Sequence, residues 1–135
     1  MTKQQAVLLR EADLSPAGRG DGATTLRLVN QSCGSQSMIN SITTVPPVSE
    51  TPLHYQNYEE NSLVFSSTFI AVVGEIEFAI KTVDVTWTPS NLRHQFQNGS
   101  DRYSMCIFLT YASAGVNRTI VKTGKTHFIN AEHKA

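Results

Sequence analysis

Two short segments of the chain hold side chains whose types and spacing could do chemistry. The first contains His54, Gln56 and Glu60, and the second places His94 a few residues after a turn-forming Pro-Ser-Asn run. In an extended chain, side chains two residues apart project to the same side, so His54, Gln56 and Glu60 are expected to share one face. Imidazole and carboxylate groups bind metal ions and transfer protons. These two segments therefore form the candidate site.

The elements that would position these side chains are short strands. Runs rich in β-branched and aromatic residues alternate with Pro, Gly, Asn and Asp, which favour turns. Helical periodicity appears only weakly, at residues 3–12, and residues 15–23 are predicted to form a loop or mobile arm. Such a series of strands predicts an all-β sandwich or barrel. The predicted strands cover residues 25–29, 37–45, 62–73, 75–81, 84–88, 94–97 and 103–111.

The size and charge of the chain argue against several classes of protein. Its 135 residues suffice for one domain with one core. Eleven basic residues balance eleven acidic ones and no long basic run occurs, so we expect no nucleic-acid partner. The longest apolar stretch, residues 69–73, is too short to cross a membrane, and the first residues lack the apolar segment of a secretory signal. We therefore expect a soluble cytoplasmic domain.

The two polar segments resemble the two sequence motifs of the cupin superfamily. The first cupin motif reads His-x-His, three or four residues, Glu, six residues and Gly, and its positions are held here by His54, Gln56, Glu60 and Ser67. The second motif reads Pro-x-Gly, two residues, His, three residues and Asn, and its positions are held here by Pro89, Asn91, His94 and Asn98.

The turns between and within the motifs support this resemblance. Asn is the best substitute for a glycine that needs a positive φ, so Asn91 is compatible with the second motif. Gly74 lies midway between the motifs, where small cupins have a hairpin turn. The Pro-Gly-Asp turn that usually precedes the second motif is reduced here to Thr82-Val83-Asp84. The resemblance covers residues 24–125.

The resemblance implies an all-β cupin fold, which is a jelly-roll barrel also called a double-stranded β-helix. The barrel would span residues 24–125, between an N-terminal arm at 1–23 and a C-terminal tail at 126–135. It also implies a divalent metal (Fe, Zn, Mn or Ni) held by His54, Glu60 and His94, with the Gln56 amide oxygen as a weaker fourth ligand. Glu60 and His94 would be the catalytic residues. His127 and His133 lie outside both motifs and are interpreted as solvated tail residues.

Strand alternation predicts which residues line the cavity around this site. Residues that share the parity of Glu60 or His94 along their strands should face inward. The orientation of the strand at 103–111 stays open, but either choice gives a mostly apolar cavity for a small molecule. The predicted pocket residues are Ser62, Val64, Ser66, Phe96 and Asn98.

Three functions are compatible with this site. The leading hypothesis is a metal-dependent cupin enzyme that cyclises or isomerises a small, hydrophobic, carbonyl-bearing molecule, because a metal ion can polarise a carbonyl or enolate oxygen. Cupin polyketide cyclases are similar in using a glutamine beside the histidines. The alternatives are an Fe(II)-dependent dioxygenase, and a non-catalytic small-molecule-binding cupin that has lost its metal with the second histidine. An exposed strand edge and few charges (16% of residues) favour a homodimer.

Overall fold

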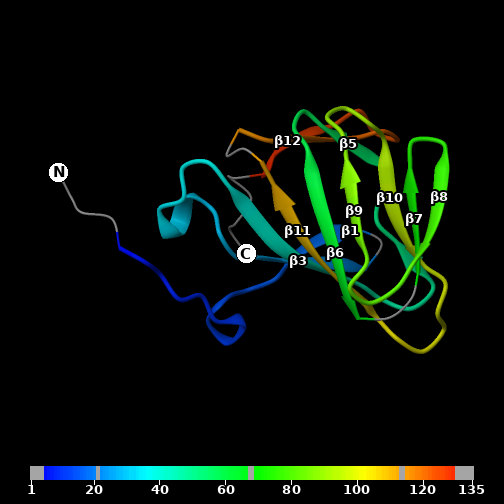
Figure 1. Cartoon of the computed structure of the whole chain (residues 1–135), viewed down its shortest axis with the longest axis horizontal. Helices are drawn as coiled ribbons and strands as arrows, with labels where there is room; N and C mark the ends of the chain where they lie inside the picture. The colour runs from blue at the N-terminus through cyan, green and yellow to red at the C-terminus, as the bar shows by residue number, and fades with distance from the viewer. Residues whose placement is uncertain (1–4, 21, 67–68, 113–114, 130–135) are drawn as a thin grey trace.

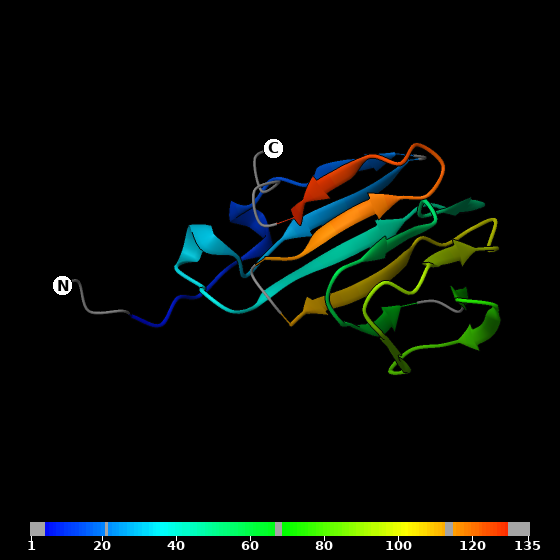
Figure 2. The same cartoon turned by 90° about the horizontal axis from the view of Figure 1, so that it is seen from above.

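The chain folds into two antiparallel β-sheets that face each other and enclose a single core (Figure 1). The structure is a computed structural model, and it describes residues 5–20, 22–66, 69–112 and 115–129. Two short 3-10 helices, η1 (Glu11–Asp13) and η2 (Gln31–Cys33), precede the long central strands. The view from above in Figure 2 separates the two layers and shows the N-terminal part of the described chain extending from one end.

The first sheet has six strands in the order β1-β2-β3-β11-β6-β9. Its long central strands, β3, β11 and β6, have seven residues each and pair over nearly their full length. The strands are β1 (Ala17–Gly20), β2 (Ala23–Arg27), β3 (Ile39–Val45), β11 (Met105–Tyr111), β6 (Glu60–Ser66) and β9 (Val85–Thr88).

The second sheet has the order β13-β12-β5-β10-β7-β8, and β4 also pairs with β10. It carries both motif segments, because β5 and β10 lie side by side in it. The strands are β13 (Thr126–Phe128), β12 (Asn117–Ile120), β5 (His54–Gln56), β10 (His94–Asn98), β7 (Phe69–Val73), β8 (Ile76–Ile80) and β4 (Ser49–Glu50).

Alternate side chains of the long strands point into the space between the sheets. Buried and half-buried residues alternate along β3, β10 and β11, as expected of strands with one face on a core. In β11 the buried set is Met105, Ile107, Leu109 and Tyr111, which settles the orientation that the sequence left open. Aliphatic and aromatic side chains fill much of this interior, and Phe69 packs edge-on against Phe96 with 6.1 Å between ring centroids.

The all-β prediction is confirmed, with differences in the placement of several elements. Residues 15–23, predicted as a loop or arm, contain β1, which pairs with β2. The single strand predicted at 62–73 is two strands, β6 and β7, which belong to different sheets. Within the described residues, the weak helical pattern at 3–12 gives no more than the short η1 at Glu11–Asp13. β13 extends the second sheet past residue 125, while the domain limits themselves stay a prediction.

Two turns confirm the backbone geometry that the sequence predicted. Gly74 has φ of 63° in the β7–β8 hairpin, and its N–H donates to the carbonyl of Arg93 at 2.7 Å. Asn91 has φ of 65°, the left-handed conformation that Asn tolerates better than other residues with a side chain. Ser67, which holds the glycine position of the first motif, lies outside the described residues.

Candidate metal centre

The two histidines of the site are brought together by strand pairing. His54 begins β5 and His94 begins β10, and the two residues are direct partners across these strands. Cross-strand partners project to the same face of a sheet. Their rings therefore lie together in the interior, with centroids 4.3 Å apart, and both residues are buried.

Backbone carbonyls fix the orientation of both imidazole rings. Nδ1 of His54 lies 2.7 Å from the carbonyl oxygen of Pro52, and Nδ1 of His94 lies 2.9 Å from that of Leu92. A carbonyl oxygen can only accept, so each Nδ1 carries a hydrogen and donates it. In the neutral ring, Nε2 then has the free lone pair, which is the arrangement found in metal-ligating histidines.

Glu60 faces the histidines from the opposite sheet. It begins β6, is 1% exposed, and places Oε2 at 3.2 Å from Nε2 of His94. The Ser62 hydroxyl donates to Oε2 at 3.0 Å, and the Gln56 amide donates to Oε1 at 3.2 Å. A buried carboxylate is stable only when its charge is compensated in this way.

Ionisation at the site follows from this pairing. Burial lowers the pKa of His94, but the Glu60 carboxylate beside it more than offsets this, so the pKa of His94 is raised. Burial works against the Glu60 charge, yet the charge of His94 and the Ser62 hydroxyl hold the pKa of Glu60 below its usual value. Burial and the neighbouring His94 lower the pKa of His54 well below its usual value. In the metal-free site, Glu60 and His94 therefore favour each other's charged forms, whereas the neutral form of His54 is favoured.

These residues fit a divalent metal. One ligand atom each from His54, Glu60 and His94 lies within 4.8 Å of the others, and all three residues are buried. Oε1 of Gln56 is buried with no hydrogen-bond partner among the described residues, and buried Nε2 of His94 faces the Glu60 carboxylate at 3.2 Å. A nitrogen lone pair facing a carboxylate oxygen is repulsive unless a proton or a cation lies between them. Two imidazoles and one carboxylate are a ligand set for Fe(II), and they also suit Zn and Mn.

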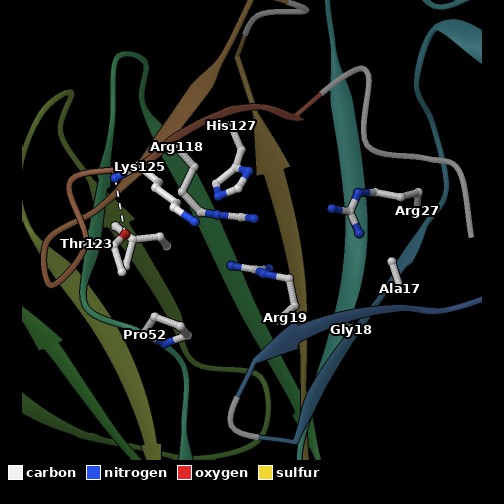
Figure 3. A pocket seen from close by; sticks show the side chains of 10 residues that line it. Ala17, Gly18, Arg19, Arg27, Pro52, Arg118, Thr123, Lys125 and His127 are labelled. Atoms are coloured by element: carbon white, nitrogen blue, oxygen red, sulfur yellow. Dashed lines mark hydrogen bonds between the residues drawn. The ribbon is translucent and has the colours of Figure 1, made fainter.

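A hollow of about 560 Å³ adjoins this centre, and four of its ten lining residues are arginines or lysines (Figure 3). Pro52, whose carbonyl orients His54, lies on its wall together with Ile120, the cross-strand partner of His54. The mostly apolar cavity predicted from the sequence stays a prediction, because apolar and charged residues share this wall. The lining residues with charged side chains are Arg19, Arg27, Arg118 and Lys125, and His127 also lines the hollow.

Three residues of this region were not identified from the sequence. Tyr111 and Thr88 flank Glu60 on the neighbouring strands β11 and β9, both buried. Burial raises the pKa of Tyr111, so its phenol is neutral. His127, interpreted as a solvated tail residue, is half-buried on β13 and lines the cationic hollow. His133 lies outside the described residues.

The predicted pocket residues occupy different places. Ser62 supports Glu60 directly, whereas Val64 and Phe96 lie in the apolar core. The Ser66 hydroxyl accepts from the Cys106 N–H at 3.1 Å, next to a register shift between β6 and β11. The Asn98 amide donates to the carbonyls of Val45, Pro46 and Tyr103, so this side chain ties loops together.

Comparison with solved structures identifies the architecture. The polyketide cyclase RemF from Streptomyces resistomycificus superimposes with a TM-score of 0.70 over 79% of each chain, at 16% sequence identity. An RmlC-like cupin from Shewanella frigidimarina superimposes with a TM-score of 0.70 over 84% of this chain and 96% of that one, at 13% identity. The chain has the cupin fold. A sugar phosphate isomerase of the cupin superfamily from Silicibacter pomeroyi also matches, with a TM-score of 0.70 over 89% of this chain and 85% of that one, at 17% identity.

Sequence comparison adds one named relative of this chain. The SchB protein of Streptomyces halstedii is 26% identical over 109 residues, which are 80% of this chain and 79% of SchB. No family model matches the chain. Among the described residues, no helix has the length and hydropathy needed to cross a membrane.

Proposed function

We propose that this cupin is a metal-dependent enzyme that cyclises or isomerises a small carbonyl-bearing molecule by proton transfer. The observation that carries the proposal is the buried group of His54, Glu60 and His94, whose ligand atoms lie within 4.8 Å of one another. We assign His54, Glu60 and His94 as metal ligands, with Oε1 of Gln56 as a further, weaker one. When bound, a divalent metal supplies Lewis acidity that polarises a carbonyl or enolate oxygen.

The protein's own groups prepare this site for proton transfer. Ser62 and Gln56 each donate a hydrogen bond to Glu60, which keeps the carboxylate ionised and fixed in orientation. We assign His94 to the metal and Glu60, 3.2 Å from His94, to moving the proton through a carboxylate oxygen that is not used as a ligand. His54, Glu60 and His94 are at most 3% exposed, and burial strengthens the electrostatic interactions between them.

The substrate class rests on the fold and on one similar structure. RemF, which has this fold, is a polyketide cyclase. We propose a polyketide-like or other carbonyl-bearing substrate by analogy with it. Fold alone does not determine function, so the proposed reaction must be tested at the site itself.

Two other functions are favoured by particular observations. Two imidazoles and one carboxylate are also the ligand set of Fe(II) dioxygenases. The hydrogen bond from Gln56 to Glu60 is the arrangement expected of a binding protein that holds no metal and uses Gln56 as a polar core residue.

Deuterium exchange under strict anaerobiosis separates the three functions. The probe is 2-acetylnaphthalene in D₂O, with protein loaded with Zn²⁺ or Mn²⁺, and exchange next to the carbonyl is followed by NMR. We expect exchange that Glu60→Gln reduces at least about tenfold, because the variant removes the carboxylate. Glu59→Gln, its exposed neighbour, is the matched control and should leave the rate unchanged. Turnover only with oxygen uptake would identify a dioxygenase, and no turnover by either route would favour the binding protein.

We further propose a homodimer located in the cytoplasm. The strands that end the two sheets, β8 and β9, expose apolar side chains: Ile76 (58% exposed), Phe78 (43%), Val85 (56%) and Trp87 (62%). Exposed edge strands are templates for pairing with a second chain. Cell fractionation tests the location.

A further inference from the structure

The cationic hollow of Figure 3 concentrates positive charge beside the proposed metal centre. Its charged side chains come from four strands or turns that are distant in sequence: Arg19 on β1, Arg27 on β2, Arg118 on β12, and Lys125 before β13. None of the described residues that line it is acidic. These side chains place several charged N–H donors around one space.

Strand register directs these side chains into the barrel. Arg118 is the cross-strand partner of Gln56, and Arg27 is the partner of Ser41, both of which face the interior. Arg19 reaches inward to the hydroxyls of Thr25 and Thr43, at 2.9 and 3.5 Å from its Nη1. Arg27 and Arg118 are each 6% exposed. Figure 3 shows the three guanidinium groups pointing into one space.

The arginines of the hollow interact electrostatically with the residues of the candidate metal centre. The charge of Arg19 lowers the pKa of Glu60 and of His54, and that of Arg118 lowers the pKa of His54. Burial and the charges of Arg118 and Arg27 in turn lower the pKa of Arg19. An anion bound between these groups would relieve their mutual repulsion.

We propose that this hollow binds the anionic group of the substrate, a carboxylate or a phosphate, through Arg19, Arg27 and Arg118. Guanidinium groups suit both anions because each presents a planar fork of N–H donors. The volume of about 560 Å³ is that of a small-molecule site. The inference rests on the proposed function in taking the anion to belong to the same molecule that reaches His54, Glu60 and His94. The substrate is then an acid rather than a purely hydrophobic ketone.

The test compares 2-naphthoate with its neutral isostere 2-naphthamide, by calorimetric titration of the full chain. We expect 2-naphthoate to bind at least about tenfold more tightly, because a buried ionic hydrogen bond is lost in the amide. Inorganic phosphate is the competing probe. Displacement of 2-naphthoate by phosphate would assign the hollow to phosphorylated substrates, and failure of displacement would assign it to carboxylates. Equal affinity for naphthoate and naphthamide would overturn the proposal.

Variants locate the bound anion. Arg19→Gln should weaken 2-naphthoate binding about tenfold, and Arg19→Lys should retain more of it because the charge is kept. Lys125→Gln, at an exposed position of the hollow, should weaken binding about twofold, with melting curves unchanged. Lys122→Gln is the matched control, since Lys122 is exposed in the same β12–β13 turn and lines a different hollow. Equal effects of Lys125→Gln and Lys122→Gln, with no effect of Arg19→Gln, would contradict the proposal.

A metal-free sample distinguishes this inference from the proposed function. Chelator-treated protein should still prefer 2-naphthoate, because the arginines do not depend on the metal. If the protein takes up no metal but still binds 2-naphthoate through its arginines, the anion site is supported and the proposed metal-dependent enzyme function is contradicted. Loss of all binding in a folded, metal-loaded protein would remove the anion site alone.

Discussion

At the scale of single residues, Gln56 decides how strongly the centre binds a metal. It donates to Glu60 through its amide nitrogen, while its amide oxygen is buried without a hydrogen-bond partner among the described residues. An amide oxygen is a weaker ligand for Zn²⁺ or Fe²⁺ than an imidazole nitrogen. We predict that Gln56→His raises affinity for Zn²⁺ about tenfold, measured by competition with a chelating dye. Unchanged affinity would mean that position 56 does not face the metal.

The pH dependence of metal binding follows from His94. The pKa of His94 is raised by Glu60, so below that pKa a metal must displace a proton from His94, whereas the lowered pKa of His54 favours its neutral form. Affinity should therefore rise with pH, by up to about tenfold per pH unit, until the raised pKa of His94 is passed. Titration with Mn²⁺ between about pH 6 and about pH 8 measures this slope. A flat profile over that range would show that His94 is not a ligand.

Some of the site residues could be predicted from sequence and others could not. The spacing of His54, Glu60 and His94 was sufficient to predict that their side chains lie together in the interior. Motif spacing and strand parity specify which face of the sheet each side chain occupies. Parity does not specify depth: Asn98 lies four residues beyond His94, or about 13 Å along an extended strand, and holds loops instead of substrate. Arg19, Thr88 and Tyr111 could not be placed, since they reach the site through pairing between distant strands.

At the scale of elements, the turn before β9 carries local strain. The N–H of Asp84 donates to the carbonyl of Lys81 at 2.9 Å, and Val83 occupies the third position of this turn with φ of 76°. A β-branched residue is strongly disfavoured in this conformation, which glycine adopts readily. Val83 is 73% exposed, so its side chain contributes little packing to offset the strain.

We predict that Val83→Gly raises the free energy of unfolding by about 1 kcal/mol, because the strain of the left-handed conformation exceeds the added entropy of the unfolded chain. Urea denaturation of the metal-free protein measures it. Val85→Gly is the matched control, since Val85 is also exposed, lies two residues away, and belongs to β9. There the same change should lower stability by about 1 kcal/mol. Destabilisation by both substitutions would show that the turn is not strained.

The elements that sequence reasoning missed have a common cause. β1, β12 and β13 are short strands of three or four residues whose inward positions carry polar side chains, including Arg118. Apolar alternation, the main signal of a half-buried strand, is therefore missing from them. These strands contribute residues to the cationic hollow. Their polar residues therefore prevented the prediction of the strands and also supply positive charge to the hollow.

At the scale of the whole molecule, the two edge strands predict an assembly. Trp87 is 62% exposed on β9 and donates its ring N–H to Glu59 at 2.8 Å. We predict a dimer by sedimentation at micromolar concentrations, and a larger monomer fraction for Trp87→Ser, because aromatic side chains contribute strongly to interfaces. Tyr103→Ser removes a similarly exposed aromatic (64%) from a loop and serves as the control. A monomer at all concentrations, or equal effects of the two variants, would contradict this assembly.

The interior between the sheets combines an apolar core with buried charge. The core residues Tyr111 and Val73 are strand partners of Glu60 and His94, and the hollow that contains the arginines adjoins this pair. The local excess of positive charge in the hollow cannot be inferred from the overall charge, because eleven basic and eleven acidic residues balance. A molecule with an anionic group and a carbonyl group would match this arrangement, with the anionic group in the hollow and the carbonyl at the metal centre.

The metal content of untagged protein tests the central claim most directly. We predict about one divalent metal ion per chain by elemental analysis, after purification or after addition of Fe, Mn, Ni or Zn, with Glu60→Gln and His94→Gln each reducing it at least about tenfold. Glu59→Gln, at the exposed neighbouring position, should retain the full content. Less than about a tenth of an ion per wild-type chain, unrecovered with any of these metals, would contradict the assignment of His54, Glu60 and His94 as a metal centre.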